Sequence, residues 1–238
     1  MNVPQLIVDL NNKAIQCLLQ GNSDGSVAAL SSALSSLQLC HNMQQTATAN
    51  SPLNLQISMA MKLLERNPTC STPMGSVVLD HSCLSDCSGT FSIFNHALTV
   101  SNSFELDSNV AKNYERLQSM LLYNLGLTLH FQAMRSGRSE ELRGALDLYE
   151  MAFSVVENAW QLFNIDDLML LLMAILNNLG HIHSNLYNME RTQTCVDWLK
   201  ALAGHPAFLK IMQRDQYSSF SMNLLVVLKQ APHCSPAA

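Results

Sequence analysis

The side chains with the most chemistry to offer lie between residues 70 and 87. Cys83 and Cys87 have a spacing that zinc sites tolerate, and Cys70 and His81 are near them in the sequence. A structural zinc ion needs four ligands held by a well-formed scaffold. The surrounding segment is rich in Ser, Thr and Pro, and nothing in it singles out a fourth ligand. We therefore expect no metal and no cofactor.

The other candidate catalytic groups have simpler interpretations. His181 and His183 lie two positions apart in a helical pattern, so their side chains point in different directions. Asp166 and Asp167 come at the start of a helical pattern, where the helix dipole stabilises acidic residues. The sequence has no Gly-rich phosphate loop and no nucleophile elbow. It predicts a protein that is not an enzyme, with a hydrolase-like or metal-dependent activity as the alternative.

The composition argues against nucleic acid as a partner. The 238 residues are 48% hydrophobic, which is enough to bury one or two cores. Only 13% are charged, the net charge is −5, and the 13 basic residues are scattered. Nucleic-acid binding needs clustered Lys and Arg to neutralise phosphates, so no nucleic acid is expected.

The apolar segments argue against a membrane location. The longest apolar run covers residues 168–176, which is too short to span a bilayer that needs about twenty residues. Residues 1–10 lack the positive charge of a secretory signal, and Asp9 interrupts their apolar run. The seven cysteines are odd in number and irregular in spacing, which is typical of reduced thiols. We expect a cytoplasmic protein, and a nuclear location fits the same observations.

Long segments carry hydrophobic residues at helical spacing. In the strongest pattern the apolar positions are Val110, Tyr114, Leu117, Leu121, Leu125 and Leu129. The predicted helices cover residues 4–20, 26–39, 109–135, 139–158, 165–186, 189–202 and 207–215, and residues 21–25 form a turn or a helix junction.

Residues 40–90 interrupt the helical pattern. They are rich in Gln, Asn, Thr and Ser, and they predict an insertion that is disordered in parts. Residues 91–100 mix aromatic, β-branched and polar side chains and are predicted to be extended, as are the similar residues 217–228. We expect these two segments to pair as a small two-stranded sheet, because lone extended edges expose unpaired backbone groups.

The predicted organisation has four parts. Residues 1–39 form a first hairpin, and residues 40–105 are the insertion with its extended end. Residues 106–204 form two further hairpins, and residues 205–238 are a cap and frayed tail.

One five-residue phrase occurs twice within these helices. Residues 122–126 read Leu-Tyr-Asn-Leu-Gly, and residues 176–180 read Leu-Asn-Asn-Leu-Gly. This pattern resembles the tetratricopeptide repeat, a helix-turn-helix unit with small and large residues at fixed places. The small residues let two helices approach closely, because a larger side chain would force them apart. The matching positions after Gly126 are Ala145, Tyr149 and Ala152; those after Gly180 are Thr192, Val196 and Leu199; and those after Ala14 are Ser26, Leu30 and Ala33.

The resemblance implies an all-α fold, a tetratricopeptide-like α-solenoid of two to three helical hairpins. As a whole the chain is similar to tetratricopeptide-like proteins of diatoms. In this family the Asn before Leu-Gly often holds the backbone of a bound peptide, which implies a groove with Asn12, Asn124 and Asn178 as peptide-binding residues. The neighbouring groove residues would be Leu127, His181 and Phe131. The family's chaperone-binding members add basic side chains that clamp a carboxylate, and this groove lacks them, so we disfavour that role.

The resemblance predicts a non-catalytic scaffold that binds a protein or peptide partner. A second reading leaves the three asparagines with a structural role, capping a helix or bonding across the stack. In a third, the groove is filled by the chain's own insertion or by a second copy, and filling by a second copy would make a self-associating structural protein and a homo-oligomer.

Overall fold

The structure is a computed structural model that describes residues 3–47, 74–79, 92–100, 110–159 and 165–205. The described residues form six helices and one two-stranded sheet, so the prediction of a mostly helical protein with a small β element is confirmed. They divide into two compact units. The first unit comprises Met1–His81 and Asn95–Leu168, and the second comprises Ser82–Phe94 and Met169–Ala238.

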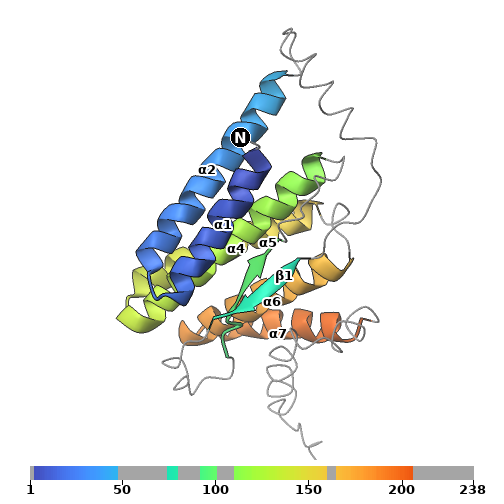
Figure 1. The fold of residues 1–238 in the computed structure, drawn as a ribbon. Helices are drawn as coiled ribbons and strands as arrows, with labels where there is room; N and C mark the ends of the chain where they lie inside the picture. The colour runs from blue at the N-terminus through green and yellow to red at the C-terminus, as the bar shows by residue number, and fades with distance from the viewer. Residues whose placement is uncertain (1–2, 48–73, 80–91, 101–109, 160–164, 206–238) are drawn as a thin grey trace, which may run out of the picture. The chain divides into compact units, whose positions relative to one another are not determined.

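The first unit contains two helical hairpins and the sheet (Figure 1). Its helices are α1 (Val3–Leu19), α2 (Ser23–Ala47), α4 (Val110–Ser136) and α5 (Ser139–Ala159), and its strands are β1 (Gly75–Val78) and β2 (His96–Thr99). Helix α1 packs against α2, α4 packs against α5, and α2 joins the hairpins by packing against α4. Strand β2 contacts both α1 and α4.

The turn between α1 and α2 is tighter than expected. Gly21 has a φ of 75°, and the N–H groups of Gly21 and Asn22 donate to the carbonyls of Leu18 (2.9 Å) and Cys17 (2.8 Å). This pattern is the Schellman motif that ends helices at a glycine. The Asn22 side chain then accepts a hydrogen bond from the Gly25 N–H (2.9 Å). Because Asn22 caps α2, the helix begins at Ser23, so the predicted turn or helix junction is present but shorter than residues 21–25.

The hairpin formed by α4 and α5 closes around a glycine. A Cβ atom added to Gly126 would lie 3.0 Å from the ring of Tyr149. Ala145, Tyr149 and Ala152 are all fully buried on α5. The predicted close approach of the two helices at these small residues is therefore confirmed.

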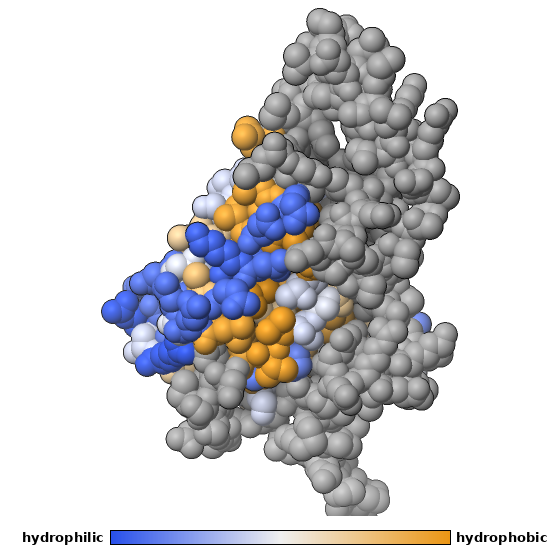
Figure 2. Space-filling model, in the orientation of Figure 1, coloured by the Kyte–Doolittle hydropathy of each residue, from blue (hydrophilic) through white to orange (hydrophobic). Residues whose placement is uncertain are grey.

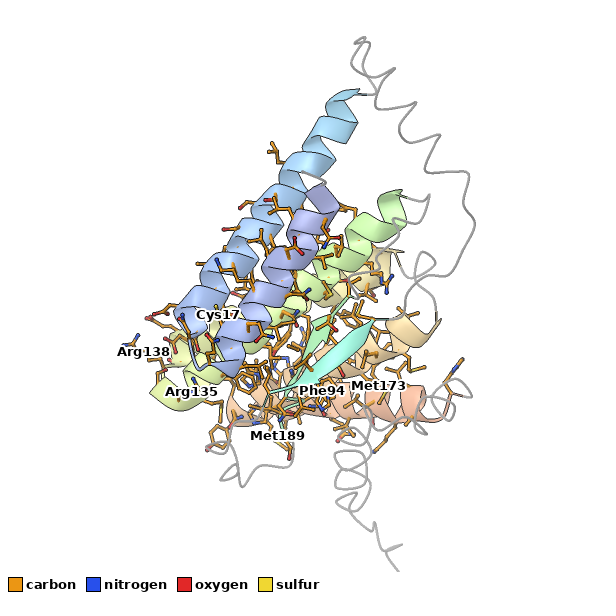
Figure 3. The ribbon with its side chains drawn as sticks, viewed as in Figure 1. Cys17, Phe94, Arg135, Arg138, Met173 and Met189 are labelled. Atoms are coloured by element: carbon orange, nitrogen blue, oxygen red, sulfur yellow. The ribbon has the colours of Figure 1, made fainter. Side chains whose placement is uncertain are left out.

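Hydrophilic residues gather at the end of the first unit where its two helical turns lie (Figure 2). The Gln132 side chain there donates to the Asp24 carboxylate at 3.2 Å, so the two hairpins also meet through polar groups. Arg135 and Arg138 project from the turn that joins α4 to α5 (Figure 3).

The partner strand in the sheet differs from the predicted one. Strands β1 and β2 are antiparallel, and Val77 lies opposite Ala97. Part of the extended segment predicted at residues 91–100 is thus a strand, but its partner lies in the predicted insertion. The four-residue β1 carries Val77 and Val78, whose branched side chains suit a strand. The predicted partner, residues 217–228, lies outside the described residues.

The second unit contains most of α6 (Ile165–Asn185), α7 (Met189–Ala203) and residues 92–94. Residues 169–183 of α6 are buried apart from Leu172, so this helix is buried on nearly all sides. The turn after α6 is a second Schellman motif, in which the N–H groups of Tyr187 and Asn188 donate to the carbonyls of Ser184 (3.1 Å) and His183 (2.9 Å). Tyr187 has a φ of 56° there, a conformation usually left to glycine.

Some of the remaining predictions fall on described residues and others lie outside them. The predicted second helix ended at residue 39, whereas α2 continues to Ala47, into the predicted insertion. The predicted helix at residues 207–215 and the four candidate zinc ligands lie outside the described residues. Among the described helices, none is both long enough and apolar enough to cross a membrane.

Candidate functional site

The two edges of β2 are satisfied in different ways. The N–H of Leu79 donates to the carbonyl of Asn95 at 2.9 Å, so these two residues form a hydrogen-bonded pair in the register of the sheet. Such pairs alternate along antiparallel strands. Residues 97 and 99 therefore bond to β1, whereas His96 and Leu98 turn their N–H and C=O groups to the opposite edge of β2.

Asparagine side chains meet that opposite edge in the first unit. The Oδ1 atom of Asn124 accepts a hydrogen bond from the Leu98 N–H (2.8 Å), and its Nδ2 atom donates to the Leu98 carbonyl (2.8 Å). Asn11 on α1 donates to the same carbonyl at 3.1 Å and accepts from Asn124 Nδ2 at 2.8 Å. The Tyr123 hydroxyl donates to the carbonyl of His96 at 3.1 Å. Together these groups form a clamp on extended backbone, which we call the Asn124 clamp (Asn11, Tyr123 and Asn124).

Helical spacing explains why the polar clamp residues are buried. Asn11 lies on the stripe of α1 that also carries Ile7, Ala14 and Leu18, all of which are buried. Asn124 is fully buried as well. Such a buried amide costs free energy unless each polar atom finds a partner, and the backbone of Leu98 supplies those partners.

A chain of buried hydroxyl groups supports the clamp from behind. Thr128 lies one turn after Asn124 on α4, and its hydroxyl donates to the Asn124 carbonyl at 2.9 Å. Ser26 on α2 bonds the same Thr128 hydroxyl at 3.2 Å. Residues from α1, α2 and α4 are thus linked in one network, in which the hydroxyl groups reach the backbone of Asn124 and Asn11 bonds to its side chain.

An equivalent contact occurs within the second unit. Asn178 on α6 accepts a hydrogen bond from the Phe94 N–H (2.8 Å) and donates to the Phe94 carbonyl (3.3 Å). Its neighbour Asn177 donates to the carbonyl of Ser92 at 2.9 Å. Phe94 is fully buried, and Figure 3 marks it on the segment that precedes β2. Asn178 and Asn124 therefore make the same two-bond contact, each with one residue of the chain's own extended segment.

The structure places most of the predicted groove residues in the interior. Asn11 on α1, rather than the predicted Asn12, contacts the backbone of Leu98, and Asn12 is partly exposed beside it. Leu127, Phe131 and His181 are buried, with exposed fractions of 0%, 1% and 2%, so they belong to the packed interior rather than to an open groove.

Burial also sets the protonation of the histidines at these sites. It lowers the pKa of His181 to about 4, and Asn185 Nδ2 lies 3.1 Å from the His181 Nδ1 atom, where the amide can donate to a neutral ring. His96 on β2 is buried too, and its Nδ1 atom lies 3.2 Å from the Ser76 hydroxyl. Burial lowers the pKa of His96 as well. Both rings are therefore neutral at pH 7, and the clamps recognise backbone through uncharged groups.

Sequence reasoning missed Asn11, Tyr123 and Asn177. For Asn11 the sequence holds no distinguishing signal, because Ile7 and Ala14 flank it at helical spacing just as Val8 and Ile15 flank Asn12. Tyr123 and Asn177 lie inside the repeated phrase, directly before each clamping asparagine. Their contacts depend on the path of residues 92–98, which helical periodicity does not describe.

The arrangement holds the backbone of the chain's own residues 92–98. Among the described residues, no group of three His, Cys, Asp or Glu side chains gathers in a way that could hold a metal ion. Comparison with known proteins gives no match: no protein-family model fits the chain, and no curated sequence or solved structure matches it.

Proposed function

We propose that this chain is a non-catalytic protein-interaction module built on tetratricopeptide-like hairpins, whose asparagine clamps hold extended backbone. The observation that carries the proposal is the two-bond contact between Asn124 and the backbone of Leu98. A primary amide offers a donor and an acceptor side by side, which matches the N–H and C=O of one extended residue. Such a contact binds a strand without reading its side chains.

Specificity then comes from the side chains that the bound segment buries. Leu98 and Phe94 are fully buried beside the backbone groups that the asparagines hold. A peptide ligand of either clamp is an extended segment with an apolar residue at the clamped position. Residues 92–100 have this chemistry, so the chain carries its own resident ligand.

Exchange of the resident segment for a peptide tests the proposal. The probe is a labelled synthetic peptide with the sequence of residues 92–100, Ser-Ile-Phe-Asn-His-Ala-Leu-Thr-Val. Leu98→Ala weakens the resident segment by removing its buried anchor, at a cost of about 2–5 kcal/mol, and leaves the clamp side chains unchanged. The milder Leu98→Val lowers the free energy of unfolding by about 1 kcal/mol, and it replaces Leu98→Ala in the assay if the alanine variant does not fold. We expect either variant to bind the probe more tightly than the wild type does, as measured by fluorescence anisotropy.

The clamp residue provides the control. Adding Asn124→Ala to the Leu98 variant should abolish binding of the probe, provided that circular dichroism shows the helices intact. If the folded Leu98 variants do not bind the probe at all, the asparagines have the structural role instead, and the interaction function is refuted.

A self-associating structural protein is the second candidate. The clamps are filled by the chain's own backbone, so they serve the packing of the protein whether or not a partner binds. Concentration-dependent mass in solution without any exchange of the probe would favour this candidate.

A further inference from the structure

The outer edge of β1 carries backbone groups that the sheet does not use. In the register of the sheet, Ser76 lies opposite Leu98 and Val78 lies opposite His96. Leu98 and His96 turn their backbone groups away from β1, toward the clamp. By the same alternation, Ser76 and Val78 turn their N–H and C=O groups away from β2. Within the part of the chain that the structure describes, these outward groups of β1 meet no hydrogen-bonding partner.

The residues of this edge do not themselves prevent strand addition. Natural edge strands are protected by short length, by charged residues, by proline, by a bulge or by a covering segment. Strand β1 is short, but it reads Gly-Ser-Val-Val without charge or proline, and its pairing with β2 is regular from Gly75 to Val78. The side chain of Val78 is 55% exposed, so this end of β1 lies at the surface.

The positions of the outward groups favour a second copy of β1 as the partner strand. Ser76 and Val78 lie on either side of Val77, so a two-fold axis at Val77 places Ser76 of each copy opposite Val78 of the other. Both pairs are then hydrogen-bonded pairs, and each exchanges two N–H···O bonds. No charged side chain lies on this edge, so the two copies meet without like-charge repulsion.

We infer that two copies of this chain associate through antiparallel pairing of their β1 strands, which joins their two-stranded sheets into one four-stranded sheet. The pairing predicts specific distances between equivalent residues of the two copies. The two Val77 residues form a non-hydrogen-bonded pair with Cα atoms about 4.5 Å apart, which is within the range for a disulfide. Two Val78 residues are offset along the strands and lie about 8 Å apart, beyond that range.

Cysteine cross-linking separates pairing from random collision. Val78 is the more exposed residue, so random collision predicts more cross-linking of Val78→Cys, whereas strand pairing predicts more of Val77→Cys. The full chain is oxidised and digested, and mass spectrometry identifies the linked peptides, with oxidised wild type as the background from the native cysteines. We expect a link between two copies at position 77 at least tenfold more abundant than the link at position 78. Equal links, or a stronger link at position 78, would overturn the inference.

A proline at position 78 tests the hydrogen bonds themselves. The Val78 N–H points outward, so Val78→Pro removes an outward donor and leaves the bonds between β1 and β2 in place. Val78→Ala is the matched control, because it trims the side chain and keeps the N–H. Sedimentation velocity across a range of concentrations should show self-association of the wild type and of Val78→Ala, and loss of it in Val78→Pro. A wild type that stays monomeric, or a Val78→Pro protein that associates like the wild type, contradicts the pairing.

Discussion

Replacement of Asn124 by alanine should destabilise the first unit more than the same replacement of Asn11, its partner in the clamp. The substitution removes the partner of two buried groups, the Leu98 N–H and the Asn11 Oδ1 atom. The Leu98 carbonyl keeps one bond, from Asn11 Nδ2 at 3.1 Å. A buried polar group left without a partner costs about 1–3 kcal/mol, so the two groups together predict a loss of about 2–6 kcal/mol.

The neighbouring Asn11→Ala substitution should cost less, for a reason visible in the same bonds. The Leu98 carbonyl then keeps its bond from Asn124 at 2.8 Å, and one N–H of the Asn124 amide loses its partner. One unpaired group predicts a loss of about 1–3 kcal/mol. In the double variant only the two backbone groups of Leu98 are left unpaired, which again predicts about 2–6 kcal/mol. The double variant should therefore be less destabilised than the sum of the single variants by about 1–3 kcal/mol.

Urea unfolding of the four proteins, followed by circular dichroism, measures these differences, and hydrogen exchange of the Leu98 amide reports on the clamp directly. The amide should exchange faster in Asn124→Ala, because it loses its acceptor, and should change less in Asn11→Ala. The reasoning is refuted if Asn11→Ala is the more destabilising change, or if the two single losses simply add.

Three further substitutions test other parts of the structure. Gly126→Ala should lower the free energy of unfolding by about 1 kcal/mol in urea, because its Cβ would lie 3.0 Å from the Tyr149 ring and the cost of overpacking exceeds the gain in helix propensity. Tyr187→Gly should raise the melting temperature, gaining about 1 kcal/mol, because Tyr187 is 88% exposed and has a left-handed φ of 56°. The stability that His181 contributes is present above the unfolded pKa of 6.5 and lost as pH falls toward the folded pKa of about 4, so urea titrations should show a slope of up to about 1.4 kcal/mol per pH unit that His181→Gln removes.

Two of these substitutions have a control in the same chain. A Cβ atom at Gly144 would meet only the flexible end of Leu129, at 3.2 Å, so Gly144→Ala should be neutral or stabilising. Gly21 occupies the same turn position as Tyr187 with a φ of 75°, so Gly21→Ala should destabilise where Tyr187→Gly stabilises. If both changes shift the melting temperature in the same direction, the backbone argument fails. A His181→Gln protein with an unchanged pH slope would assign that slope to other groups.

The positions of the helices could be predicted from the sequence, because the spacing of apolar residues along the chain determines them. Each helix in the described residues begins within three positions of its predicted start, and α2 differs most, because Asn22 caps it earlier than the glycines suggested. Close packing at Gly126 was predicted through the resemblance to the tetratricopeptide repeat, in which small residues lie where two helices approach closely. The partner of β2 was not, because strand pairing depends on segments far apart in the chain and on no local period.

The asparagines show where reasoning from residue types ends. An amide that matches an extended backbone makes the same two bonds with a foreign peptide as with its own chain, so the side chain alone does not distinguish them. Whether the asparagines hold a foreign peptide or their own chain depends on the path of residues 92–100. Their mixed pattern indicated an extended segment but did not indicate that it lies against the asparagines. Asn124 and Asn178 already hold the backbone of Leu98 and Phe94, so any partner peptide has to displace residues 92–100. An external peptide must replace bonds that already exist, so its affinity depends on how readily the resident segment leaves. For this reason the Leu98 variants, rather than the asparagine variants alone, decide between a binding clamp and a structural one.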